Sequence, residues 1–137
     1  MKIYKITDNI YLSGSIDDYN ELSKKNIDLI INARSEQHDD IYELTKQGII
    51  YFWIPINDHL PPRLDQIGIF RNIMKKFSDR NILIHCAVGK GRSVSLIIIY
   101  MMDNGISYNN AIDIIKHKKI DVMPTSEQKR KILKLYE

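Results

Sequence analysis

The chain has 137 residues and a formal net charge of +3, with 44% hydrophobic and 27% charged residues. This length favours one domain, residues 1–137, with a core large enough to fold without disulfides or metals. No apolar run approaches the roughly 20 residues of a membrane-spanning helix, and the polar start lacks the apolar core of a signal peptide. The single cysteine, Cys86, excludes an intramolecular disulfide and favours a reducing compartment. We therefore expect a cytoplasmic, monomeric protein.

Short strands and helices alternate along the chain, as judged from hydrophobic spacing and turn residues. The cap residues expected at helix starts are Ser15, Ser107 and Thr125. The expected strands cover residues 3–6, 10–12, 27–31, 49–54 and 82–85, and the expected helices cover residues 16–25, 41–46, 65–77, 94–102, 107–118 and 125–137.

This alternation, with short connections, predicts an α/β fold with a central, mostly parallel sheet of about four to five strands flanked by helices on both faces. The helix over 94–102 is hydrophobic on all sides, so we expect it to be central and buried. The polar connection over 32–40 should lie at the carboxyl edge of the sheet, where ligands of such folds bind. Arg34 within it is a candidate phosphate ligand or, alternatively, a structural arginine.

One stretch combines a nucleophile with an anion cradle. Residues 82–93 read Ile-Leu-Ile-His-Cys-Ala-Val-Gly-Lys-Gly-Arg-Ser, which predicts a strand, a tight glycine loop and a helix start. Converging backbone N–H groups and the positive helix end would bind an anion and favour the thiolate of Cys86. Arg92 follows after five residues and can grip two oxygens of a phosphate. The expected phosphate-binding residues are Ala87, Val88, Gly89, Lys90, Gly91 and Arg92.

The run His-Cys-Ala-Val-Gly-Lys-Gly-Arg-Ser resembles the HCxxGxxR[ST] signature of cysteine-dependent protein tyrosine phosphatases, specifically the small, atypical dual-specificity group. The resemblance implies that Cys86 attacks phosphorus to form a phosphocysteine, that Arg92 stabilises the transferring phosphoryl group, and that Ser93 assists departure of the thiolate. It implies no metal and no other cofactor. His85 would tune Cys86 through hydrogen bonds, although a purely structural core histidine remains an alternative.

A second stretch, residues 54–62, supplies a carboxyl group in a proline-stiffened loop after a strand. Phosphomonoester cleavage needs a proton for the leaving oxygen and later a base for water. The stretch resembles the acid loop of the same phosphatases, which implies that Asp58 performs both tasks. Asp65 is expected to cap the next helix instead. Gln128 is either part of a capping box with Thr125 or, by the resemblance, a residue that positions the hydrolytic water, and both alternatives stay open.

The expected function is hydrolysis of phosphotyrosine, with phosphoserine and phosphothreonine as further candidates, in a phosphorylated protein partner. Three departures from the family pattern qualify this expectation: Val94 after the signature, the extra cation Lys90 within it, and Lys118-Lys119-Ile120 before the last helix. Lys90 and the basic C-terminal region would also suit polyanionic substrates, so a phosphoinositide or RNA 5′-phosphate phosphatase is the alternative enzyme. A phosphate-binding module without turnover is the alternative from another class.

Overall fold

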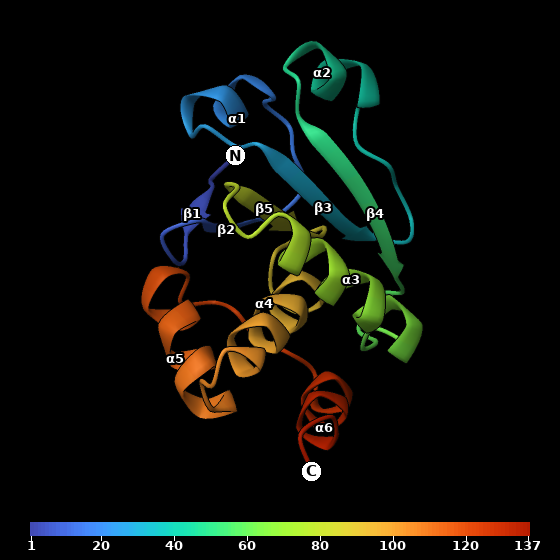
Figure 1. The fold of residues 1–137 in the computed structure, drawn as a ribbon, viewed down its shortest axis with the longest axis vertical. Helices are drawn as coiled ribbons and strands as arrows, with labels where there is room; N and C mark the ends of the chain where they lie inside the picture. Colours follow the sequence, from blue (N-terminus) through green and yellow to red (C-terminus); the bar gives the residue numbers. More distant parts are fainter.

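The computed structural model describes residues 1–137, which form a five-stranded sheet of order β1-β2-β5-β3-β4 packed between helices (Figure 1). Strand β1 is antiparallel to β2, and every other neighbouring pair is parallel. The strands are β1 (Tyr4–Lys5), β2 (Ile10–Ser13), β3 (Leu29–Arg34), β4 (Ile50–Ile56) and β5 (Ile82–His85), and the helices are α1 (Asn20–Lys24), α2 (Ile41–Lys46), α3 (Leu64–Lys76), α4 (Arg92–Asp103), α5 (Tyr108–Lys118) and α6 (Ser126–Lys134). The predicted α/β architecture is confirmed.

Successive side chains of the central strands point to opposite faces of the sheet and so belong to two separate hydrophobic cores. In β5, Ile82 and Ile84 belong to the larger core beneath α3, α4, α5 and α6, whereas Leu83 belongs to the smaller core that includes Leu22 of α1 and Leu44 of α2. Because both faces of the strands are covered, their sequences are almost continuously apolar. This explains why hydrophobic runs rather than alternation identify these strands.

Helix α4 lies in the middle of the larger helical layer (Figure 1). It contacts β2, β3 and β5 on one side and α3, α5 and α6 on the others. Val94 and all four residues 96–99 are fully buried, as the sequence predicts for a helix that is apolar all round. Each such side chain contributes about 1.5–3 kcal/mol of hydrophobic stabilisation. The loop between β5 and α4 is therefore anchored at both ends in the best-packed part of the molecule.

The first helix is shorter than predicted. Helix α1 begins at Asn20 rather than near residue 16, and its N-cap residue is Tyr19. The predicted cap residue Ser15 instead donates hydrogen bonds from its N–H and its Oγ to the carbonyl oxygen of Ala87, at 2.9 and 3.3 Å. A tertiary contact to the loop before α4 has thus replaced the local cap.

Other element boundaries differ from prediction by one to three residues, and two of the differences involve residues named above. Strand β3 continues through Arg34, so Asn32, Ala33 and Arg34 belong to the sheet and not to a connecting loop. Asp65 is not the cap of α3, because Arg63 occupies the N-cap position and its N–H donates to the side chain of Gln66. Asp65 lies in the first turn and forms an exposed ion pair with Arg63. Local sequence patterns located these elements but not their ends.

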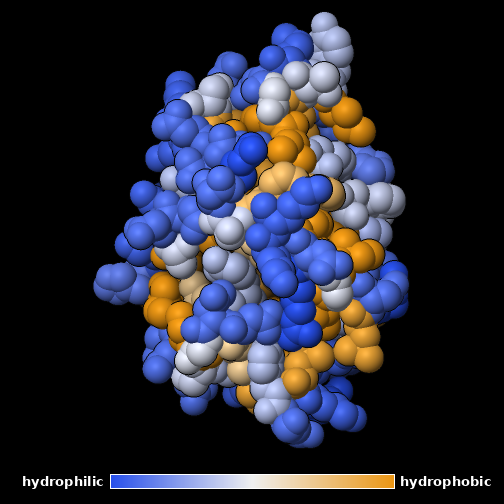
Figure 2. All heavy atoms as spheres, in the orientation of Figure 1, coloured by the Kyte–Doolittle hydropathy of each residue, from blue (hydrophilic) through white to orange (hydrophobic).

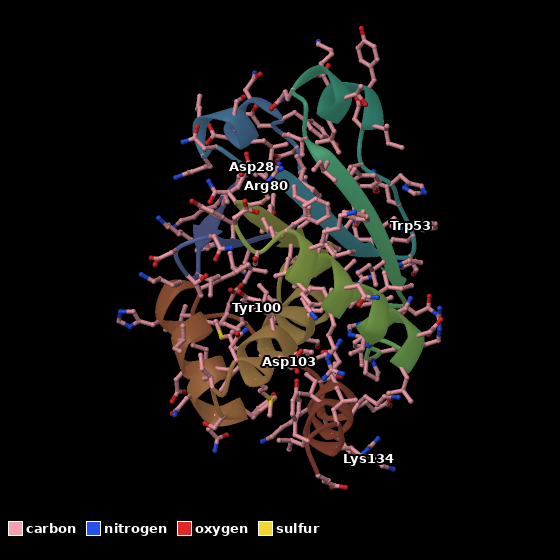
Figure 3. The ribbon with its side chains drawn as sticks, in the orientation of Figure 1. Asp28, Trp53, Arg80, Tyr100, Asp103 and Lys134 are labelled. Atoms are coloured by element: carbon pink, nitrogen blue, oxygen red, sulfur yellow. The ribbon has the colours of Figure 1, made fainter.

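The face of the molecule drawn in Figure 2 is predominantly polar. On the face drawn in Figure 2, hydrophilic side chains cover most of the area and apolar side chains appear in separate groups. Trp53 extends outward from the edge strand β4 (Figure 3), and its indole N–H donates to the carbonyl oxygen of Arg34. None of the helices combines the length and the apolar character needed to cross a membrane.

Candidate active site

The loop between β5 and α4 uses glycine for its backbone conformation at Gly89 and for close packing at Gly91. Gly89 has a φ of +69°, and a Cβ atom built there would lie 2.9 Å from the carbonyl oxygen of Ser13. At Gly91 a Cβ atom would lie 2.8 Å from Oε1 of Gln128. The loop is therefore packed tightly against β2 and α6 on its outer side, and Cys86 lies at its start, only 2% exposed.

The Cys86 thiol is set up to ionise. Burial by itself raises its pKa, but a hydrogen bond from Ser93 Oγ, the N–H groups of Ser93 and Gly89, and the charge of Arg92 outweigh burial and lower the pKa overall. The Cys86 Sγ and Ser93 Oγ atoms are 3.1 Å apart. The sequence-predicted nucleophile and its predicted hydroxyl partner are thus in direct contact.

Arg92, the first residue of α4, is almost fully buried, and three of its N–H groups are already engaged. Nη1 donates to Oε1 of Glu36 at 2.7 Å and to the carbonyl oxygen of Ile56 at 2.9 Å, while Nη2 donates to Oε2 of Glu36 at 2.9 Å. A guanidinium has five N–H donors, so one on Nε and one on Nη2 remain. These two share one edge of the group, which is the arrangement that grips two oxygens of a phosphate.

Glu36 is a site residue that the sequence analysis did not single out. It lies in the connection after β3, its side chain is about half exposed, and its hydrogen bonds with Arg92 lower its pKa to about 2. The same pairing raises the pKa of Arg92 further above its ordinary value. One feature of the sequence could have identified Glu36: residues 32–40 were expected at the carboxyl edge of the sheet, beside the strand that leads to Cys86.

Asp58 lies at the opening of the site. Its Oδ1 atom is 3.6 Å from Nε of Arg92, next to the unoccupied edge of the guanidinium, and its side chain is 62% exposed. The chain turns sharply after it: His59 has a φ of +68°, and its N–H donates to Oδ1 of Asp58. A carboxyl group in this place can reach a phosphate ester bound to Arg92 and also remains open to water.

Helix α6 fixes the loop that carries Asp58. Thr125 Oγ1 donates to the carbonyl oxygen of His59 at 2.9 Å, and Nε2 of Gln128 donates to the carbonyl oxygen of Leu60 at 3.1 Å. Thr125 and Gln128 also form the capping box that the sequence suggested. One N–H of the buried Gln128 amide has no partner among these contacts, so its role in positioning water remains a prediction.

A chain of buried polar groups lies beneath the loop. His85 is fully buried, its Nε2 is 2.7 Å from Oδ2 of Asp39, and its Nδ1 is 3.2 Å from the carbonyl oxygen of Cys86. Asp39 also accepts a hydrogen bond from Arg34 at 2.9 Å. The structure thus places Arg34 in a structural ion pair rather than at the phosphate, and links the His85 ring to the cysteine that follows it.

The segment before α6 is attached to the cradle. The Lys119 ammonium donates to the carbonyl oxygen of Val88 at 3.3 Å and to Asp121 at 2.6 Å. The Met123 N–H donates to the carbonyl oxygen of Lys90, and the Lys90 ammonium is 4.0 Å from Asp121. Within the unusual Lys118-Lys119-Ile120 run, Lys119 is therefore the residue that supports the loop around the phosphate site.

Comparison with known proteins agrees with this geometry. A family model described as the dual specificity phosphatase catalytic domain matches residues 10–137. Dual specificity protein phosphatase 9 of Homo sapiens is 31% identical over 127 residues, which cover 88% of this chain and 32% of that protein. Protein tyrosine phosphatase type IVA 3 of Bos taurus is 28% identical over 115 residues, which cover 81% of this chain and 64% of that protein.

A crystal structure of Tk-PTP in its active form superposes with a TM-score of 0.82 and 25% identity, covering 97% of this chain and 94% of that one. The chain spans about a third of the length of the first of these relatives, 32% of dual specificity protein phosphatase 9. The match over residues 10–137 includes both the cysteine loop and the loop of Asp58. This chain therefore belongs to the dual specificity phosphatase catalytic domain family.

Proposed function

We propose that the protein hydrolyses phosphomonoesters of phosphorylated proteins through a phosphocysteine intermediate. The observation that carries this proposal is the free edge of the Arg92 guanidinium. Its other N–H groups contact Glu36 and Ile56, and the free edge lies in the same loop as Cys86, whose thiol has a lowered pKa. A phosphate held by that edge and by the loop amides would place phosphorus beside the nucleophile. Catalysis would then rest on positioning and on charge stabilisation by fixed donors.

In the first step the Cys86 thiolate attacks phosphorus in line with the leaving oxygen. An S–P bond forms as the P–O ester bond breaks, and Asp58 donates its proton to the departing alkoxide or phenoxide. The charge on the three equatorial phosphoryl oxygens is stabilised by the loop N–H groups and by Arg92. The products of this step are the free hydroxyl compound and the phosphocysteine.

In the second step water replaces the protein alcohol. The carboxylate of Asp58, now deprotonated, accepts a proton from water as the water oxygen attacks phosphorus, and the S–P bond breaks to release inorganic phosphate. The Ser93 hydroxyl donates to the departing thiolate, as its 3.1 Å separation from Cys86 Sγ supports. Gln128 is the candidate for holding this water, through the amide N–H that neither the cap nor Leu60 engages.

The proposed substrates are phosphotyrosine, phosphoserine and phosphothreonine side chains, because the names of the relatives describe dual-specificity and tyrosine phosphatases. Polyanionic substrates are a further proposal, supported by Lys90 and by the lysine-rich segment attached to the cradle. We also propose that residues 1–137 act as one catalytic domain, as a monomer, in a reducing compartment such as the cytoplasm. The free thiol of Cys86 supports this last proposal, since an oxidised nucleophile would be inactive.

The test is hydrolysis of aryl phosphates in the presence of EDTA, comparing the parent with Cys86→Ser and Asp58→Asn. The serine variant should lose turnover entirely. The asparagine variant should lose far more activity on phenyl phosphate than on 4-nitrophenyl phosphate, because the better leaving group needs less protonation. Rapid quenching of the Ser93→Ala variant with labelled substrate should trap a phosphoprotein, which Cys86→Ser should not form.

An inert parent that still binds vanadate would instead establish a phosphate-binding module, with Cys86 as part of the cradle. Equal activity losses for both aryl phosphates in Asp58→Asn would assign proton transfer to another group. Parallel assays with phosphopeptides carrying each of the three phosphorylated residues would then define specificity. Failure on all three, with turnover of the aryl ester, would exclude protein substrates.

A further inference from the structure

The rim of the phosphate cradle carries exposed apolar side chains. Ile120 is 87% exposed, Met123 is 74% exposed and Val88, within the cradle loop itself, is 62% exposed. None of them is needed for the chemistry proposed above. We refer to these three residues as the apolar rim. Large apolar side chains exposed together beside a binding site are typical of surfaces that contact something other than water.

The apolar rim is held in place relative to the site. Met123 donates its N–H to the carbonyl oxygen of Lys90, and the buried Lys119 ammonium bridges the carbonyl oxygen of Val88 and the carboxylate of Asp121. The segment that carries Ile120 and Met123 is thus attached to the loop that surrounds the phosphate. Whatever covers this rim would lie next to the bound phosphate.

Positive charge lies beside Ile120 of the rim. Ile120 is part of the wall of a surface pocket of about 440 Å³, which four lysines also line: Lys2, Lys116, Lys118 and Lys119. Asp121 is the only carboxylate in that wall, and it is already paired with Lys119. The surface beside the cradle is therefore apolar and cationic together, which calls for a partner that is apolar and anionic together.

The shape of this surface distinguishes between a peptide and a lipid bilayer as its partner. Neither Val88 nor Met123 lines any of the five surface pockets, and the one pocket that Ile120 lines has mostly charged and polar residues in its wall. A peptide segment would find no apolar groove for its side chains here, because Val88 and Met123 are exposed outside the pockets and the pocket beside Ile120 is mostly polar. A lipid bilayer deforms around protruding side chains, accepts them at the boundary of its acyl chains, and attracts lysines when it contains anionic lipids.

We propose that the apolar rim and its lysines dock the protein on an anionic membrane surface, with the phosphate cradle facing the lipid headgroups. The proposal goes beyond phosphatase activity and does not require it, since docking is measured by binding. It implies that phosphomonoesters presented at such a surface are favoured substrates, whether they belong to a lipid headgroup or to a membrane-bound protein.

The test is cosedimentation of the full chain with vesicles of phosphatidylcholine alone and with vesicles that also contain phosphatidylserine. Binding should need the anionic lipid and should weaken as salt is added. Each lysine near an anionic surface changes partitioning by roughly fivefold, so Lys116→Gln/Lys118→Gln should bind roughly 25-fold more weakly. The variant Ile120→Gln/Met123→Gln should bind at least about tenfold more weakly.

Matched controls remove the same kinds of side chain elsewhere. Ile41→Gln/Ile69→Gln removes two exposed apolar side chains on α2 and α3, and Lys25→Gln/Lys75→Gln removes two exposed lysines. All four variants should retain the parent's turnover of a soluble aryl phosphate. Rim variants should lose vesicle binding and control variants should retain it.

Two results would overturn the proposal. One is the absence of parent binding to phosphatidylserine vesicles at low salt, and the other is equal loss of binding in rim and control variants. If acidic phosphopeptides lose affinity in the rim variants while vesicles never bind, the surface recognises protein instead. If the parent binds vesicles but does not hydrolyse aryl phosphate, the docking proposal stands and the proposed phosphatase activity is refuted. Failure of one proposal can therefore be distinguished from failure of the other.

Discussion

Replacing Asp39 by Asn should reveal how much of the fold's stability depends on the charges beneath the cysteine loop. The Asp39 side chain is 1% exposed and accepts from Arg34 and His85 at 2.9 and 2.7 Å. Asparagine preserves the shape but removes the charge, which leaves the buried guanidinium of Arg34 without a counterion. Breaking a buried pair from one side costs about 3–5 kcal/mol. That is a large share of the roughly 5–15 kcal/mol by which domains are stable.

The assay is urea unfolding followed by far-ultraviolet circular dichroism. With a slope of about 2 kcal/mol per molar urea, the midpoint should fall by about 2 M. Asp40→Asn is the matched control, because Asp40 is the exposed N-cap of α2 and Asn caps as well as Asp. Its midpoint should barely change.

A double-mutant comparison tests the ion pair between Arg34 and Asp39. Arg34→Met destabilises alone, but in combination with Asp39→Asn it removes both charges, so the double variant should be more stable than the sum of the single effects predicts. Aryl phosphate turnover should fall in Asp39→Asn, because the His85 ring loses the carboxylate that orients it. A loss of stability below about 1 kcal/mol for Asp39→Asn, or strict additivity of the two changes, would refute the reasoning.

Three further outcomes follow from contacts at the loop. In Ser93→Ala the pKa of Cys86 should rise, since a hydrogen bond to the thiolate is lost, and the pH midpoint of its alkylation by iodoacetamide should move upward; an unchanged midpoint would contradict the assigned contact. Glu36 has a pKa lowered from 4.5 to about 2, so its contribution to stability is complete above pH 4.5 and declines as the pH falls towards 2. The free energy of unfolding of the parent, measured by urea titration, should therefore exceed that of Glu36→Gln by about 1 kcal/mol at pH 7 and by little at pH 2. The value at pH 7 is modest because the ion pair is half exposed. Gly89→Ala should destabilise by more than 1 kcal/mol and impair turnover, whereas Gly68→Ala, within α3 and free of neighbours, should stabilise by about 0.5–1 kcal/mol; similar melting temperatures for the two variants would exclude steric strain in the loop.

The sequence was most informative where function depends on neighbouring residues. The cysteine loop places nucleophile, amides, arginine and hydroxyl within eight consecutive positions, Cys86 to Ser93, so their spacing alone predicts their geometry. The alternation of strands and helices likewise predicted the sheet, because parallel strands buried on both faces have a distinct composition.

Residues whose partners are distant in the chain escaped prediction. Glu36 and Asp39 contact Arg92 and His85 across more than forty residues, and nothing in the polar run 32–40 indicates which of its carboxylates turn inward. Ser15 carries a capping pattern, yet the hydrogen bonds it makes go to the cysteine loop. In each case strand order, which local patterns do not specify, decides which groups meet.

The attachment of α6 to both reactive loops has a consequence for synthesis on the ribosome. Asp58, Cys86 and Arg92 all leave the exit tunnel before Thr125 and Gln128, which hold the acid loop and close over Gly91. A nascent chain can therefore display its thiol while the carboxyl group that would complete the reaction is still unanchored. The proposed activity should therefore begin only when α6 docks.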